Sequence, residues 1–256
     1  MAHVCAIDAA RRNADQGAGG RGSVRSAADP IGIPCRNFIG PQPNLFAGLN
    51  PRQVEIVTSC AESCRLKKSD LLFMQGSAHN GVFIIQSGII RTFFVAPKGR
   101  EITLAYWRPG NLVGTPEVLS DGVHLWSGEA VVPTEVLVLK TSVLRSLIQE
   151  IPQLALRVIE ALEFKGKCFS GMVQMLGTMS VSERIVEAVG TLMNVYGTRE
   201  PEGIVLRAPF THEAIANMVG ASRQWVTMEL HALEKRGIIR VSKRAIVVMT
   251  PERLKV

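Results

Sequence analysis

Two short amphipathic stretches, joined by a glycine and a serine, occupy residues 211–239 and constrain the fold of this chain most. Apolar residues recur at three- and four-residue steps in both stretches, which predicts two helices with one buried face each. Gly220 can adopt the positive φ that ends the first helix, and Ser222 can cap the second. The turn is about three residues long, as a helix-turn-helix requires. The sequence therefore predicts this motif.

Polar residues at the start of the second helix suit the reading of DNA bases. Arg223, Gln224 and Thr227 are predicted on its exposed N-terminal part, the end that enters a major groove in this motif. Arg can fork onto guanine and Gln onto adenine. We expect Thr211 and Ser222 to contact backbone phosphate. The alternative is an ordinary helical hairpin with solvated polar ends.

The segment after Gly237 adds positive charge and two β-rich stretches, which together predict a wing. Residues 238–249 form these stretches around a turn at Ser242, Lys243 and Arg244. We expect Lys243 and Arg244 to contact backbone phosphate of the DNA. Residues 220–256 hold eight Lys and Arg against three acids, so they supply +5 of the formal charge of +7. Counterion release from DNA phosphate favours such a cationic surface. The predicted partner is double-stranded DNA.

The composition of the chain limits the classes of protein to which it can belong. Residues 1–44 are rich in Ala, Gly, Arg, Ser and Pro without apolar periodicity, so we interpret them as a mobile arm or an over-long start. No apolar stretch reaches the length of about eighteen residues that a membrane helix needs, and the N-terminus lacks the pattern of a signal peptide. Five scattered cysteines suit a reducing cytosol. We therefore expect a cytoplasmic protein with no membrane partner.

Short apolar runs separated by glycine turns characterise residues 45–145. The runs begin at Leu71, Val82, Ile89, Ile102 and Glu135, and this spacing predicts an antiparallel jelly roll or barrel. A long helix over residues 152–176 follows, within a segment 146–178 that ends in a hinge. Residues 179–256 then form the winged helix-turn-helix domain. The predicted fold class is α+β, with a jelly roll, one long dimerisation helix and a C-terminal DNA-binding domain.

Apolar residues along the long helix alternate four- and three-residue steps, which is typical of a two-stranded coiled-coil seam. Lys165 interrupts this seam, and a neighbouring stripe is equally apolar: Ile159, Leu162, Phe169, Val173 and Leu176. Two stripes indicate a helix contacted by a partner chain on one side and by its own roll on the other. The alternative is a helix buried once, in a monomer. The residues predicted to face the partner in a homodimer are Leu154, Val158, Ala161, Cys168, Met172 and Met175.

The order of these parts, over about residues 45–256, resembles the Crp/Fnr family of bacterial transcription regulators. Glycine-bearing segments 75–76, 82–88, 98–104 and 109–114 match the spacing of the family's β-roll, and residues 221–227 resemble its recognition helix. By resemblance, Arg223 reads a guanine, Gln224 stands where many members carry Glu, and Met228 stands where some carry a second Arg. The resemblance also implies RNA polymerase as a partner and an effector that shifts a two-state equilibrium.

The effector region departs from the cyclic-nucleotide branch of the family. Thr115 stands where that branch has Glu, and residues 109–139 contain no Lys or Arg to hold a cyclic phosphate. Thr115, Pro116 and Glu117 still favour a short helix start. We therefore expect an unidentified small effector, not cyclic AMP, or a cavity filled by side chains. The pocket residues predicted for such an effector are Gly114, Thr115, His124, Trp126, Ser127 and Phe169.

Other chemistries remain as alternatives. A redox or haem sensor of the same fold would use Cys60 and Cys64 or a histidine of the roll, but an iron–sulfur cluster needs four thiolates. A jelly-roll metal enzyme needs clustered histidines, whereas His79 and His124 are expected to be isolated. The sequence names no cofactor, and we predict a regulator and no enzyme.

Overall fold

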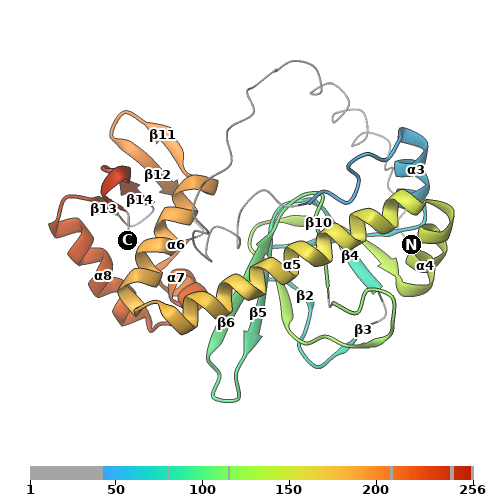
Figure 1. Ribbon diagram of the computed structural model, residues 1–256, viewed down its shortest axis with the longest axis horizontal. Coiled ribbons are helices and arrows are strands. Elements are labelled where there is room, and N and C mark those ends of the chain that lie inside the picture. Colours follow the sequence, from blue (N-terminus) through green and yellow to red (C-terminus); the bar gives the residue numbers. More distant parts are fainter. Residues whose placement is uncertain (1–42, 80, 115, 208–209, 243–244, 255–256) are drawn as a thin grey trace. The chain divides into compact units, whose positions relative to one another are not determined.

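The computed structural model describes residues 43–79, 81–114, 116–207, 210–242 and 245–254 (Figure 1). The predicted arm, residues 1–44, lies outside these ranges except for its last two residues. The α+β fold class is confirmed, with a β-roll, a long helix and a C-terminal helix-turn-helix in that order.

An antiparallel β-roll follows the short helix α3, Pro51–Ser59. Its strands form two four-stranded sheets, ordered β1-β10-β4-β7 and β2-β9-β5-β6, and a two-stranded β3-β8 pair. The strands are β1 Glu62–Leu66, β2 Leu71–Phe73, β3 Ala78–His79, β4 Gly81–Ser87, β5 Ile90–Val95, β6 Glu101–Trp107, β7 Leu112–Val113, β8 Gly122–Val123, β9 Ser127–Ala130 and β10 Thr134–Lys140. All five predicted apolar runs lie in strands, whereas β1 and β9 carry polar sequences and escaped prediction.

The turn between β4 and β5 shows why the roll depends on glycine. Gly88 has a φ of +88°, and a Cβ placed there would meet the Pro133 carbonyl oxygen at 2.6 Å. Directly after it, the Ile89 amide donates to Thr134 Oγ1 at 3.1 Å. A residue with a side chain would therefore force this turn away from β10.

Two helices follow the roll: α4, Thr141–Glu150, and α5, Pro152–Thr178. Pro152 begins α5 at a position where its missing amide proton costs no hydrogen bond. The helix runs alongside the roll (Figure 1) and its C-terminal end reaches the core of the C-terminal domain, which contains Met172 and Met175. One helix thus supplies side chains to the core of the roll and to the core of the C-terminal domain.

The buried face of α5 overturns the predicted dimer seam. Its residues are 0–8% exposed: Leu154 0%, Val158 3%, Ala161 5%, Cys168 0%, Met172 8% and Met175 0%. Leu154, Val158 and Ala161 pack in the core of the roll and its flanking helices. Side chains that already pack inside their own chain are not available to a second copy. The spacing marked a buried face correctly, but apolar periodicity does not say which neighbour buries it.

A second stripe of α5 has the same spacing and faces solvent. Its members are all exposed: Leu156, Ile159, Glu163, Gly166, Ser170, Val173 and Gly177. Three of them are apolar and lie 52%, 58% and 71% exposed, at Leu156, Ile159 and Val173. Leu162 and Phe169, which the sequence grouped with Ile159, instead pack against the chain's own cores. We name these seven residues the outer stripe.

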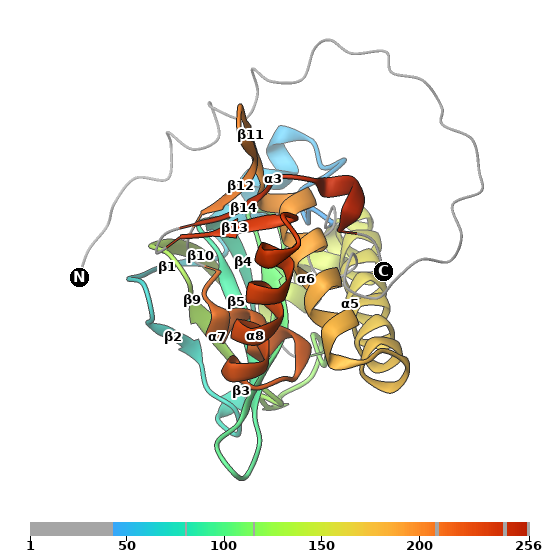
Figure 2. The ribbon, with the colours of Figure 1, turned by 90° about the vertical axis from the view of Figure 1, so that its left-hand side faces the viewer.

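The C-terminal domain begins at Ser180, whose side chain and that of Glu183 form a reciprocal capping box at the start of α6. Its elements are α6 Val181–Tyr196, β11 Thr198–Glu200, β12 Gly203–Arg207, α7 His212–Val219, α8 Arg223–Lys235, β13 Ile239–Val241, β14 Ala245–Val248 and a 3-10 turn at Pro251–Arg253. The strands form one sheet, ordered β11-β12-β14-β13, beside α6 and α8 (Figure 2). The predicted winged helix-turn-helix is confirmed.

Candidate DNA-binding surface and sensor interior

Local capping fixes the geometry of the helix-turn-helix. Thr211 caps α7, where its hydroxyl accepts from the Ala214 amide at 3.1 Å. Gly220 ends that helix in the left-handed conformation, with φ 62° and ψ 37°. Ser222 then caps α8 by accepting from the Trp225 amide at 3.2 Å. The turn therefore consists of Gly220, Ala221 and Ser222, as the sequence predicted.

The N-terminal end of α8 presents polar side chains to solvent. Arg223 and Gln224 are exposed, whereas Val226, Leu230 and Leu233 on the opposite face are buried in the domain core. The amphipathic pattern thus anchors one face of α8 and leaves the other free. This arrangement can bring a guanidinium and a carboxamide to the edges of base pairs.

The hydroxyl of Thr227 already makes two contacts within the domain, which the sequence did not predict. It donates to the Arg223 carbonyl at 2.9 Å and lies 3.0 Å from His212 Nδ1. Burial lowers the pKa of His212, and the charges of Arg223 and His231 lower it further. His212 is therefore a neutral partner that orients Thr227 beneath a cationic surface.

The predicted phosphate contacts fall into two groups. Thr211 and Ser222 use their hydroxyl oxygens as caps, which leaves each hydroxyl proton available to an acceptor such as phosphate. In the wing, β13 and β14 pair from Val241 opposite Ile246, and the Ser242 amide donates to Ala245 O at 2.9 Å. The tip residues Lys243 and Arg244 lie outside the described part of the chain.

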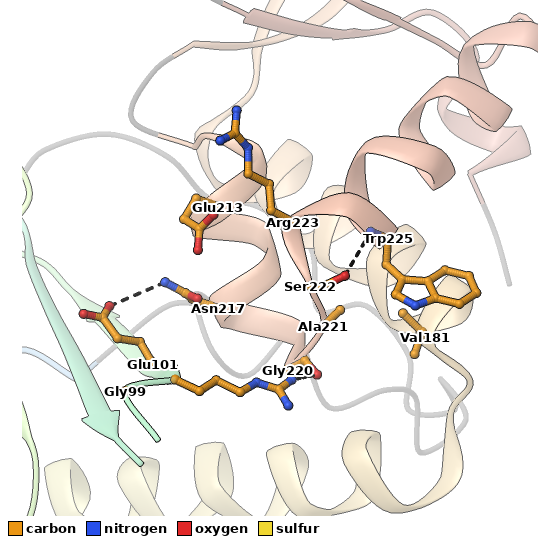
Figure 3. A pocket seen from close by; sticks show the side chains of 11 residues that line it. Gly99, Glu101, Val181, Glu213, Asn217, Gly220, Ala221, Ser222, Arg223 and Trp225 are labelled. Carbon is orange, nitrogen blue, oxygen red and sulfur yellow. Dashed lines mark hydrogen bonds between the residues drawn. The ribbon is translucent and has the colours of Figure 1, made fainter. Parts of the chain in front are cut away.

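The turn between β5 and β6 reaches the helix-turn-helix, a contact that sequence reasoning missed. An Arg100 Nη donates to the carbonyl oxygen of Gly220, and Asn217 Nδ2 donates to Glu101 Oε2 at 3.5 Å. A groove of about 800 Å³ opens beside them, lined by Glu213, Ser222 and Trp225 among others (Figure 3). The only signal was a Gly-Arg-Glu run at a hairpin tip, and no local pattern says what a hairpin tip touches.

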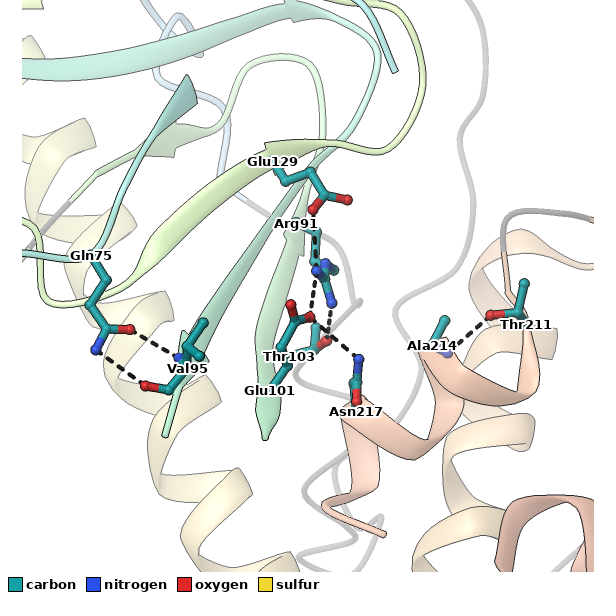
Figure 4. Close-up of polar contacts among 9 residues, drawn as sticks. All are labelled: Gln75, Arg91, Val95, Glu101, Thr103, Glu129, Thr211, Ala214 and Asn217. Carbon is teal, nitrogen blue, oxygen red and sulfur yellow. Dashed lines mark hydrogen bonds and ion pairs between the residues drawn. The ribbon is translucent and has the colours of Figure 1, made fainter. Parts of the chain in front are cut away.

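Glu101 is itself held by the roll. Arg91 lies between two carboxylates, 2.8 Å from Glu101 and 3.3 Å from Glu129, and Figure 4 shows these contacts beside Asn217. The side chain of Arg91 is only 11% exposed. Because the Arg91–Glu101 ion pair is partly shielded from water, it orders Glu101 better than a surface pair would.

Three of the predicted effector residues, His124, Trp126 and Phe169, contribute rings to aromatic contacts within the roll and between the roll and α5. Trp126 packs edge-on against Phe169 of α5, with ring centroids 5.5 Å apart. His124 stacks on Phe73 at 4.2 Å. Ser127 Oγ accepts from the Gln75 amide at 3.0 Å, so its hydroxyl supports the fold of the roll. Gly114 is buried with a φ of +133°, and Thr115 lies outside the described residues.

Two expectations about the roll are wrong. His79 and His124 are not isolated, because β3 pairs with β8 and brings their ring centroids to 5.3 Å. Residues 116–140, all described, contain no helix. Instead the Glu117 carbonyl lies 3.0 Å from His79 Nε2, and Val118 donates to the Pro116 carbonyl in a tight turn. A local helix signal of three residues was overridden by this tertiary contact.

Metal and redox chemistry gain no support from the described residues. They contain no group of three or more His, Cys, Asp or Glu side chains that could hold a metal ion. Cys60 is exposed at the end of α3 and Cys64 lies on β1, so the two thiols belong to different elements. Cys168 is buried, and burial raises its pKa to about 12. A thiol of that kind is inert.

Two sequence profiles match the two halves of this architecture. Residues 63–151 match the cyclic nucleotide-binding domain, and residues 183–256 match the Crp-like helix-turn-helix domain. The chain belongs to the Crp/Fnr family. It is thus a DNA-binding transcription regulator and not an enzyme.

Curated relatives of this regulator align over most of their own length. It is 24% identical over 210 residues to the CRP-like cAMP-activated global transcriptional regulator of Mycobacterium tuberculosis, covering 82% of this chain and 94% of that protein. It is 27% identical over 204 residues to the cyclic AMP receptor protein of Thermus thermophilus, with coverage of 80% and 91%.

Solved structures agree on the fold. The c-di-GMP responsive global regulator CLP of Xanthomonas campestris superposes with a TM-score of 0.71 at 19% identity, covering 78% of this regulator and 99% of that chain. A mutant of CooA from Carboxydothermus hydrogenoformans gives a TM-score of 0.66 at 23% identity, with coverage of 77% and 88%. In addition, no helix of the described residues is long and apolar enough to cross a membrane.

Proposed function

We propose that this regulator binds an inverted-repeat DNA site as a homodimer and that its β-roll senses a small effector. The observation that carries the proposal is α8, a capped helix with Arg223 and Gln224 exposed at its N-terminal end. Family membership supports DNA binding in general. The residues that read bases, the pairing surface and the effector are the specific parts of the proposal.

Base reading is assigned to Arg223 and Gln224, with Thr227 beside them. An Arg fork onto guanine and a Gln pair onto adenine each contribute about 1–3 kcal/mol of discrimination. Thr227 is tied to Arg223 and His212, so its contribution is to hold the surface in place as well as to contact a base. Thr211, Ser222, Lys243 and Arg244 are the proposed phosphate contacts.

Homodimerisation is assigned to the outer stripe of α5. Leu156, Ile159 and Val173 are apolar and exposed in a single chain, whereas Gly166 and Ser170 are small enough to let two helices approach closely. The four- and three-residue steps are the spacing that keeps two helices in register over several turns. A two-fold dimer then places two copies of α8 on half-sites about one helical turn apart.

The effector is proposed to be a small molecule other than cyclic AMP, and RNA polymerase is proposed as the partner of the DNA-bound dimer. Residues 109–139 contain no Lys or Arg. The nearby Arg108 guanidinium stacks over Tyr196 of α6 at 4.2 Å. A cyclic phosphate in the roll would therefore lack the charged fork that binds it in the cyclic-nucleotide branch.

Selection of binding sites from a random DNA pool tests the base-reading assignment. We expect an inverted repeat for the wild type and, for Arg223→Ala, a loss of about 1–3 kcal/mol with flattened preference at one position of each half-site. Arg236→Ala removes the same charge from the other end of α8 and should keep the preferred sequence. Lys243→Ala should weaken all sequences alike and lower the salt slope by about one. If Arg223→Ala keeps the wild-type preference, α8 does not read bases through this residue.

A further inference from the structure

Lys165 is a charged side chain with no partner in the middle of α5. It is 3% exposed, and its Nζ has no hydrogen-bond partner among the described residues. Burial lowers its pKa to about 8, so most molecules still carry the charge at neutral pH. An unpaired buried ammonium costs several kcal/mol. The sequence noted this lysine only as an interruption of an apolar seam.

One aromatic ring, that of Trp107, lies near the ammonium but does not neutralise it. Nζ lies 5.6 Å from the ring centroid of Trp107, and Phe164 packs edge-on against the same indole at 6.4 Å. Trp126 and Phe169 form a second edge-on pair against the same cluster. A cation–π contact contributes about 0.5–2 kcal/mol. That gain is smaller than the cost of burying the charge, so an anion would still be attracted.

A second polar atom without a partner borders the same cluster. His124 is 4% exposed, its Nδ1 has no hydrogen-bond partner in the part of the chain that the structure describes, and its ring stacks on Phe73 of the cluster. Burial and the neighbouring His79 lower the pKa of His124 to about 4, so the ring is neutral at physiological pH. The aromatic interior thus combines one cation with one neutral polar group. Sites for small ligands have this composition, apolar walls and few polar groups.

We propose that this interior binds a small aromatic carboxylate, with its carboxylate on Lys165 Nζ and its ring among Trp107, Trp126, Phe164 and Phe169. One ammonium matches one carboxylate, whereas the ribose hydroxyls of a nucleotide would find few partners between aromatic walls. Phe164 and Phe169 are half-buried, so their side of the cluster lies nearest to solvent. Lys165 and the outer stripe share α5, and this inference rests on the proposed function of the roll as a sensor.

Calorimetric titration of the full chain with benzoate, phenylacetate, 3-phenylpropionate and indole-3-acetate tests the proposal. At least one acid should bind saturably with a dissociation constant below about 1 mM, and its neutral amide should bind about ten- to a hundredfold more weakly. Cyclic AMP, which is also an anion, should not compete. Equal binding of acid and amide, or no saturable binding by any of the four acids, would overturn the proposal.

Two lysine variants on the same helix separate charge recognition from general effects. Lys165→Met removes the charge at similar length and should abolish the preference for acid over amide while raising the melting temperature. Lys167→Met is the matched control, because Lys167 is exposed and forms an ion pair with Glu163 on the surface of the same helix. An unchanged acid affinity in Lys165→Met would also contradict the proposal. Sequence-specific DNA binding, measured in parallel, tells the two ideas apart: its loss with acid binding intact refutes only the proposed function.

Discussion

Val158 and Ile159 are neighbours on α5 whose substitution by Glu should have opposite consequences. Val158 is 3% exposed and packs in the core of the roll with Leu154 and Ala161, whereas Ile159 is 58% exposed on the outer stripe. A charge at Val158 should therefore lower the stability of the fold. A charge at Ile159 should instead weaken the proposed pairing of two chains.

The structure sets the size of each effect. Val158→Glu buries a carboxyl without a partner, which costs about 3–5 kcal/mol and is a large part of a typical stability of about 5–15 kcal/mol. Ile159→Glu changes a solvent-facing residue, so the single chain should lose no more than about 0.5 kcal/mol. In the dimer, the apolar area still exposed at Ile159 is lost from both copies. That loss amounts to about 3 kcal/mol, or about a hundredfold in the dissociation constant.

Sedimentation velocity over a range of concentrations, together with urea unfolding, measures both quantities. We expect Ile159→Glu to sediment as a folded monomer at concentrations where the wild type is a dimer. Val158→Glu should unfold at much lower urea. Gln149→Glu, which places the same charge on an exposed position of α4, should change neither. A dimer that persists in Ile159→Glu would refute pairing through the outer stripe, and a normally stable Val158→Glu would refute its burial.

Two further predictions concern the sensor. Titration with cyclic AMP or cyclic GMP should give no saturable heat at micromolar concentration, because residues 109–139 supply no cation, and saturable binding that strengthens DNA binding would contradict this. The second concerns His124, whose pKa falls from 6.5 to about 4 on folding. Its contribution to stability is complete above pH 6.5 and is lost towards pH 4, on the order of 3 kcal/mol in all. Urea unfolding between these pH values should show this loss in the wild type and a flatter profile in His124→Phe, whereas an equal slope in both proteins would refute the assignment.

The helix-turn-helix could be predicted from residues 211–239 because its determinants are local. Gly220 at a left-handed position, the caps at Thr211 and Ser222 and the apolar steps of α8 act within one or two turns of chain. The exposure of Arg223 and Gln224 follows from the same periodicity. Strands β4, β5, β6 and β10 could also be predicted, because short apolar stretches between glycine turns are compatible with few structures other than strands.

The partners of each buried face were decided only by the tertiary structure. The four- and three-residue steps along α5 identified a face that includes Val158 and Met172, but whether a second chain or the chain's own cores cover it depends on where the roll and α7 lie. The same holds for the approach of His79 to His124, the contact of Arg100 with Gly220 and the burial of Lys165 beside the Trp107 ring. The periodicity of apolar residues predicts that a side chain is buried. It does not predict which residue buries it, because that neighbour lies in a segment far away in the sequence.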